Sequence, residues 1–171
     1  MSNDAINLKR TSTVLKPDQS RVLLRPFNPG DSQRTGRIIA RIMALPEEHV
    51  GHLLDEVSAE FSQRHQDIRR TFLERFEQVR MEHDPKGDLS EQRRLLIGSY
   101  FLAEYSLESA ALFNPSIVMH PNQAGLPPGA LRFILSLRAT GEGHISSITF
   151  RTGIIDSNNR IEVLDAAGFL T

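Results

Sequence analysis

Polar side chains that could bind a sugar or an anion stand among apolar strand residues in the C-terminal third of the sequence. They are Asn114, Ser116, Arg138, His144, Ser146, Ser147 and Arg151. Arginine and asparagine offer hydrogen-bond donors in fixed directions, and a rigid sheet holds such groups in place, so sites for hydroxyl groups and anions are built from them. Structural roles also explain these residues, because Asn114-Pro115 is typical of a turn and a strand arginine commonly faces solvent.

The motifs of the common catalytic chemistries are absent from the sequence. It has no GxxxxGK[ST] phosphate loop, no HExxH metal motif and no GxSxG nucleophile elbow. The absence of cysteine excludes disulfides, thiolate metal sites and cysteine nucleophiles. His49 and His52 are three residues apart and could contact one metal, but a surface or capping role explains this pair better. We therefore expect no metal site and no catalytic residue in this chain.

Composition limits the classes of partner. The 171 residues are 39% apolar and carry a formal net charge of -1, so there is no broad positive surface. We expect neither nucleic acid nor a membrane as a partner. The first residues, MSNDAINLKR, lack the apolar core of a secretory signal. The expected location is the cytoplasm.

The residue pattern changes near Asn114 from helical periodicity to short strand signals, which predicts an α+β protein. We expect a flexible tail over residues 1–20, a strand followed by helices over 21–113, and a β-meander over 114–171. Four strands without a closing sequence leave sheet edges open, so the chain is expected to be a truncated, N-terminal piece of a larger β structure.

Three helices are expected in the first half. The first is capped by Asp31 or Ser32 and ends before Pro46. The second follows Pro46 and runs for about nine turns to Val79 along one apolar stripe. His65 falls on this stripe, where a packing role is expected. The third starts at a capping pair formed by Asp88 and Glu91 and is apolar nearly all round, so it should be buried on several sides.

The order of three segments resembles the opening of the β-propeller in glycoside hydrolase family 130, the β-mannoside phosphorylases and related β-mannosidases. The segments are ALFNPSIV, FILSLRA and GHISSITFRTGIID. The earlier stretches RVLLRPFNPGD and RIIARIMALPEEHV look like the helical N-terminal extension of a bacterial branch of that family. The resemblance covers essentially the whole chain but only the N-terminal part of a family member. It implies a helical extension followed by the first blade or blades of a five-bladed propeller.

The resemblance also implies roles for the polar strand residues. Asn114 matches the family's asparagine that binds the sugar in subsite -1, and Arg138 matches a strand arginine of the same subsite. Ser116 is shifted by one position from the family's serine, and Arg151 stands near a Ser-x-Asp-Gly position where this chain has Arg-Thr-Gly. His144 is included as a lining residue by its proximity alone.

The implied activity is cleavage of β-mannosidic linkages with inversion, by phosphorolysis to mannose 1-phosphate or by hydrolysis. The family's general acid is an aspartate of a later segment, expected beyond Thr171, so the chain by itself should be inactive. Loss of general acid catalysis alone would cost about 10²- to 10⁴-fold in rate. The expected partners are a β-mannoside oligosaccharide and further copies of the chain, with inorganic phosphate as co-substrate of a phosphorylase and no other cofactor. The alternative is a non-enzymatic module whose long helix presents its apolar stripe to a partner.

Overall fold

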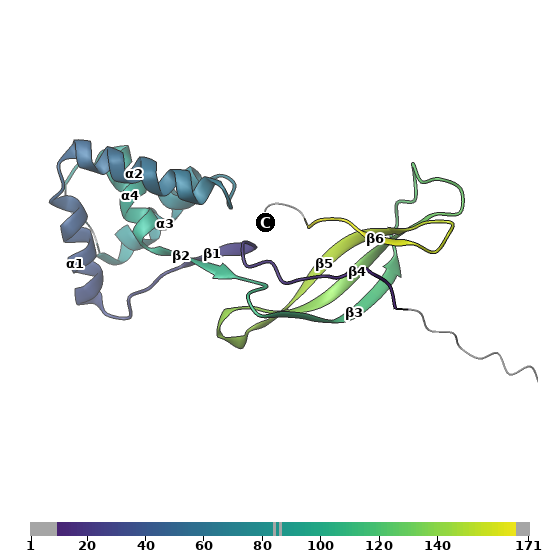
Figure 1. The fold of residues 1–171 in the computed structure, drawn as a ribbon. Helices are drawn as coiled ribbons and strands as arrows, with labels where there is room; N and C mark the ends of the chain where they lie inside the picture. The colour runs from purple at the N-terminus through teal and green to yellow at the C-terminus, as the bar shows by residue number, and fades with distance from the viewer. Residues whose placement is uncertain (1–9, 84, 86, 167–171) are drawn as a thin grey trace, which may run out of the picture. The chain divides into compact units, whose positions relative to one another are not determined.

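The computed structural model describes residues 10–83, 85 and 87–166. Within them the chain forms helices and two antiparallel sheets, which confirms the α+β class (Figure 1). The chain divides into two compact units. One is a helical unit over residues 19–107, and the other is a β unit that combines the described parts of residues 1–18 with residues 108–166.

The helical unit contains a bundle and a two-stranded ribbon. Its elements are β1 (Val22–Pro26), α1 (Ser32–Met43), α2 (Glu47–Ser62), α3 (Ile68–His83), α4 (Glu91–Tyr100) and β2 (Leu102–Ser106). Strand β1 pairs antiparallel with β2. Helix α4 contacts each of the other three helices, and its Leu95, Leu96 and Ile97 are buried in the common core. The prediction that this segment is enclosed on several sides is therefore confirmed.

The predicted ends of α1 are confirmed. The side chain of Asp31 accepts a hydrogen bond from the backbone N–H of Gln33 at 2.8 Å, so Asp31 satisfies one of the free amides at the helix start. The helix ends at Met43, before Pro46, and Pro46 immediately precedes α2.

The prediction of one long helix after Pro46 is wrong. The segment breaks into α2 and α3 at residues 63–67, where Asp67 has a positive φ of 51°. The apolar spacing carries across the break because both helices turn their apolar residues into the same core. Periodicity alone does not distinguish two helices that share a core from one continuous helix.

The bounds predicted for the next helix are also wrong at both ends. Ser90, rather than Asp88, caps α4 by accepting a hydrogen bond from the N–H of Arg93 at 3.1 Å. At the other end the helix stops at Tyr100, and the apolar residues that follow enter β2. Of the β2 residues, Tyr105 is buried and Leu102 packs against the helical core.

The β unit is a single four-stranded antiparallel sheet in the order β3-β4-β5-β6. Its strands are β3 (Ala111–Met119), β4 (Leu131–Thr140), β5 (Ser146–Ile155) and β6 (Ile161–Val163). Each strand pairs with the next one along the chain, which confirms the predicted meander. The described strands form an open sheet, and the propeller stays a prediction.

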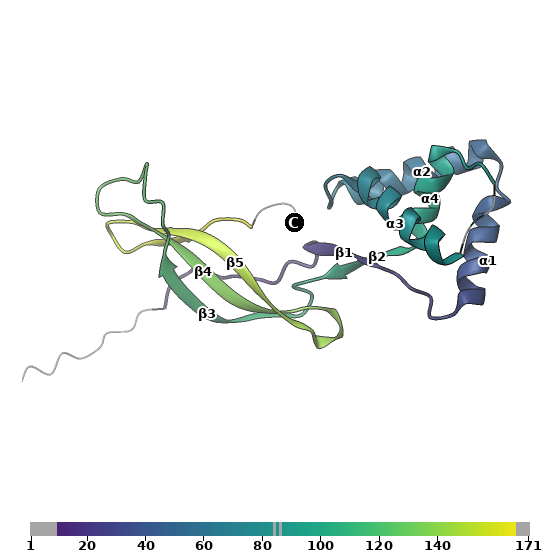
Figure 2. The same cartoon turned by 180° about the vertical axis from the view of Figure 1, so that it is seen from behind.

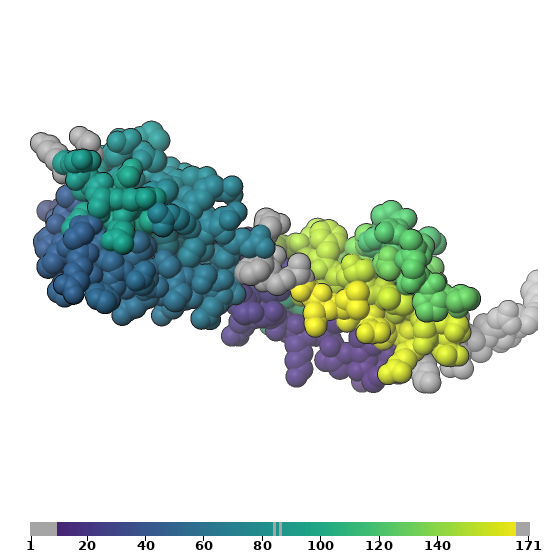
Figure 3. All heavy atoms as spheres, turned by 90° about the horizontal axis from the view of Figure 1, so that it is seen from above, coloured from purple at the N-terminus to yellow at the C-terminus, as the bar shows by residue number. Residues whose placement is uncertain are grey.

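One face of this sheet carries the core of the unit. Phe133, Leu135 and Leu137 of β4 are buried there. Residues 10–18 run along this sheet, in front of β4 in Figure 1 and behind it in Figure 2. Leu15 packs against the core, and the Thr13 hydroxyl donates to the carbonyl oxygen of Ile161 at 3.1 Å. The space-filling view of Figure 3 accordingly shows this segment, in purple, beside the yellow C-terminal strand.

Helices α3 and α4 approach so closely that only glycine fits at one position. A Cβ atom added to Gly98 would lie 1.9 Å from the carbonyl oxygen of Phe72. Gly51, in α2, offers a matched contrast, because an added Cβ would meet only the Gln92 side chain at 3.6 Å.

We predict that Gly98→Ala destabilises the helical unit by about 1–3 kcal/mol, because the helices must move apart to admit the methyl group. Gly51→Ala should be neutral or stabilising by up to about 1 kcal/mol, since alanine favours a helix interior. Urea unfolding followed by circular dichroism measures both. Equal effects of the two substitutions would contradict the close approach.

Candidate functional site

The pairing of β3 with β4 brings Asn114 next to Arg138. Phe113 is the direct cross-strand partner of Arg138, and the register then shifts through a bulge between Phe113 and Ser116. Asn114 lies in this bulge with a φ of 51°, a left-handed conformation that asparagine tolerates better than most residues. Asn114 and Arg138 are both exposed. The two residues with the strongest sequence argument are therefore neighbours at an accessible part of the sheet.

The guanidinium group of Arg138 is held by its neighbours. Its Nε and Nη2 atoms donate to the hydroxyl oxygen of Ser146 at 3.1 and 2.8 Å. Its Cζ atom lies 5.1 Å from the centre of the Phe113 ring, within the range of a cation–π contact. These contacts use only part of the five N–H donors of the group, so others can bind a ligand.

Arg151 lies on the opposite face of the sheet from Arg138. Arg138 is paired with Ile148, and Arg151 is paired with Leu135. Because strand side chains alternate between faces, Arg151 shares the face of the buried Leu135, whereas Arg138 points to the other side. The structure therefore does not bring the two arginines together.

Arg151 instead forms a buried ion pair. Its Nη2 atom lies 2.8 and 2.7 Å from the two carboxylate oxygens of Glu108, and its Nη1 atom donates to the Thr149 hydroxyl at 2.8 Å. Glu108 is 0% exposed and Arg151 is 8% exposed. This geometry joins the segment that enters β3 to the inner face of β5, which is a structural role.

The two remaining predicted residues lie near Asn114 and Arg138 along the chain. Ser116 follows the bulge, is exposed, and is paired with Ser136, whose hydroxyl donates to the Ser116 carbonyl oxygen at 3.4 Å. His144 is exposed in the turn over Glu142–His144 that joins β4 to β5, with a φ of 59°. This turn is the tip of the β4–β5 hairpin.

Phe113 was not among the residues predicted to bind a ligand, and Ser146 was one of the polar candidates but without a predicted contact to Arg138. Both occur in the quoted segments, but their contacts with Arg138 depend on the strand register. A one-residue change in that register would move each side chain to the other face. Their role as supports of Arg138 therefore follows from the cross-strand pairing.

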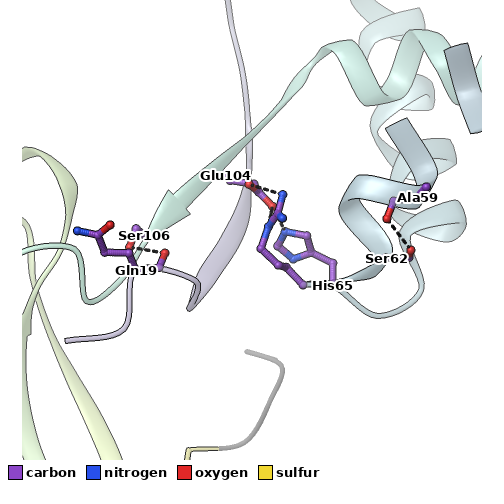
Figure 4. A network of polar contacts seen from close by, with 7 residues as sticks. Gln19, Ala59, Ser62, His65, Glu104 and Ser106 are labelled. Atoms are coloured by element: carbon purple, nitrogen blue, oxygen red, sulfur yellow. Dashed lines mark hydrogen bonds and ion pairs between the residues drawn. The ribbon is translucent and has the colours of Figure 1, made fainter. Parts of the chain in front are cut away.

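A second polar cluster occupies the helical unit and was not predicted. Glu104 of β2 accepts hydrogen bonds from Arg64 Nε at 2.9 Å, from Arg64 Nη2 at 3.1 Å and from His65 Nε2 at 2.7 Å (Figure 4). His65 is buried and its ring lies 5.8 Å from that of Phe61, so the packing role predicted for it is confirmed. The cluster ties the break between α2 and α3 to the strand.

The hydrogen bonds in this cluster change the acidity of Glu104. Burial by itself would raise the pKa of Glu104, but the hydrogen bonds from Arg64 and His65 outweigh that effect and lower the pKa below its usual value. The folded state therefore favours the ionised carboxylate. The cluster is a stabilising contact rather than a proton donor poised near neutral pH.

Within the residues described, no group of three or more histidine, aspartate or glutamate side chains is placed to hold a metal ion. None of the described helices combines the length and apolar character needed to cross a bilayer.

No family model, no curated protein and no solved structure matches the chain. The candidate site therefore depends on the geometry around Asn114 and Arg138.

We predict that Glu104→Gln lowers the stability of the helical unit at neutral pH. The stability of the variant should also change less with pH in the acidic range than that of the wild type. The folded pKa of Glu104 is depressed, so its contribution is present above the unfolded pKa and is lost as the pH falls through the folded pKa. Thermal unfolding of both proteins between neutral and acidic pH measures the difference. Glu56→Gln, at an exposed position of α2, is the control. A parallel pH profile for wild type and Glu104→Gln would contradict the prediction.

We predict that Arg151→Met destabilises the β unit by about 3–5 kcal/mol, because it leaves the Glu108 carboxylate buried without its cation. The double variant Glu108→Leu with Arg151→Met should recover part of this loss. Arg138→Met should change stability by less than about 0.5 kcal/mol, because Arg138 is exposed. Chemical unfolding measures all three. An equal loss from Arg151→Met and Arg138→Met would argue against the ion pair.

Proposed function

We propose that the chain is the N-terminal part of a carbohydrate-active enzyme that cleaves β-mannosidic linkages with inversion. In this proposal Asn114 and Arg138 bind the mannose unit, and the β unit is the first blade of a propeller. The observation that carries the proposal is that these two exposed residues occupy neighbouring positions of the β3–β4 pair, with Asn114 in the bulge directly after the partner of Arg138. The segment order that resembles glycoside hydrolase family 130 supplies the substrate class.

The chemistry of the pair suits a sugar. An asparagine amide both donates and accepts, and a guanidinium group donates in a fixed plane, so together they can pair with adjacent hydroxyl groups. Ser146 and Phe113 restrain Arg138 in advance, which lowers the entropy that binding must cost. Arg151 is left out of the proposed sugar site because its guanidinium is already bonded to Glu108.

In this proposal the general acid belongs to another part of the enzyme, and the attacking group is phosphate or water. An inverting phosphorylase needs one general acid, because phosphate itself attacks the anomeric carbon, whereas an inverting hydrolase also needs a base to activate water. The role assigned to this chain is to hold the mannose ring at the bond that is cleaved. Removing such a contact affects binding and rate together when it strengthens in the transition state.

The non-enzymatic alternative receives less support. It requires an apolar helix stripe that faces a partner, but Val50, Leu54, Phe72, Phe76 and Val79 of that stripe are buried in the core of the helical unit. The helices therefore use this surface on one another.

The direct test is to incubate the protein encoded by the complete reading frame with β-mannobioses, with and without inorganic phosphate. Mannose 1-phosphate would indicate phosphorolysis, and free mannose alone would indicate hydrolysis. No turnover of any β-mannobiose would contradict the proposal.

The residue assignment is tested in the same protein. We predict that Asn114→Ala and Arg138→Ala each lower kcat/KM by about 10- to 100-fold, the effect expected for the loss of a hydrogen bond or a charged contact to the substrate. Arg132→Ala is the matched control, because Arg132 is another β4 arginine whose Nη1 atom donates to the Asn122 carbonyl oxygen at 3.0 Å. An equal effect of Arg132→Ala and Arg138→Ala would contradict the assigned site.

A further inference from the structure

The two edges of the four-stranded sheet differ. Strand β6 has three residues, and one of its carbonyl groups, that of Ile161, accepts the hydrogen bond from Thr13. Strand β3 has nine residues, and no described strand pairs with its outer side. An unpaired strand of this length is a template for another strand. The edge at β3 is therefore the one available for association.

The backbone groups that point outward from β3 can be assigned from its pairing with β4. The N–H of His120 donates to the carbonyl oxygen of Arg132 at 3.0 Å, so His120 turns its backbone groups toward β4. Hydrogen-bonding direction alternates along an antiparallel strand, so Val118 also faces β4, while Ile117 and Met119 face away. The N–H and C=O groups of these two residues line the outer side.

The side chains at this edge are apolar on both faces of the sheet. Ile117, Val118 and Met119 are 52%, 59% and 66% exposed. Proteins commonly protect such an edge with a charge, a proline or a bulge. Here the bulge and Pro115 protect only the first part of β3, and the stretch from Ser116 to Met119 carries no charge.

We propose that β3 pairs with β3 of a second copy of the chain and so continues the sheet across a two-fold axis. In this arrangement Val118 lies opposite Val118 of the second copy, and Ile117 lies opposite Met119. The outward groups of Ile117 and Met119 exchange four backbone hydrogen bonds across the axis. Such an interface uses the same surface on both copies and closes at two.

The choice of a second copy rests on self-complementarity. With Val118 on the axis, Ser116 lies opposite His120, and the stretch Ser116–His120 contains no Asp, Glu, Lys or Arg residue that could meet a like charge. The same register sets Ile117 beside Met119 on one face and Val118 beside Val118 on the other, and these are apolar pairs. The proposal concerns an association surface and is independent of the proposed enzymatic function.

Because the chain has no cysteine, a single introduced cysteine can form a disulfide only with the same cysteine of another copy. Val118 would form a non-hydrogen-bonded pair on the axis, with a Cα–Cα distance of about 4.5 Å, which falls within the range of about 4.4–6.8 Å found for disulfides. Under mild oxidation Val118→Cys should form a disulfide-linked dimer on a non-reducing gel. Ile148→Cys is the matched control, since Ile148 is 67% exposed but lies in the inner strand β5.

Sedimentation of the unmodified chain provides the second measurement. The mass should rise with concentration from 19.2 kDa toward twice that value. Val118→Asp should weaken self-association by at least about tenfold, because two carboxylates would meet on the axis. Ile148→Asp should leave it unchanged. A chain that stays monomeric, or a Val118→Cys variant that crosslinks no faster than Ile148→Cys, would overturn the proposal.

Discussion

The hydrogen-bond register of β4 between its two neighbours decides what the β unit can do. Every residue of β4 from Leu131 to Thr140 has a partner in β5, and this regular ladder fixes which side chains share a face. The bulge in β3 is the one irregularity that the β3–β4 pairing records, and it lies beside Arg138. A regular ladder thus supplies a rigid support, and a local departure from it presents Asn114 at the surface. Sites are commonly positioned by bulges in this way.

The same register explains why Arg138 of β4 and Arg151 of β5 differ so much. Arg138 and Arg151 look alike in sequence, because each follows an apolar run. Their cross-strand partners place them on opposite faces, one beside a serine hydroxyl and the other beside a fully buried carboxylate. A buried charge is costly unless it is paired with an opposite charge, so Arg151 remains in the ion pair with Glu108. Only Arg138 remains available at the surface.

Local signals in the sequence were sufficient for several elements but not for their joins. The Asp31 cap, the Pro46 boundary and the β-meander were predictable, because each depends on neighbouring residues. The break between α2 and α3 was not predicted, since the apolar spacing continues across it and the positive φ falls on an aspartate rather than a glycine. The ion pair of Glu108 with Arg151 joins residues 43 apart in sequence, and no local pattern specifies it. Long-range polar contacts depend on the tertiary fold.

The contact between Glu104 and the break after α2 has a consequence for how the helical unit moves. One carboxylate binds Arg64 and His65 together, about 40 residues away along the chain. A fluctuation that frees the segment between α2 and α3 must also leave Glu104 of the β1–β2 ribbon without its partners. The ribbon and the interhelical segment should therefore open as one cooperative event in amide hydrogen exchange, and their protection should rise and fall together.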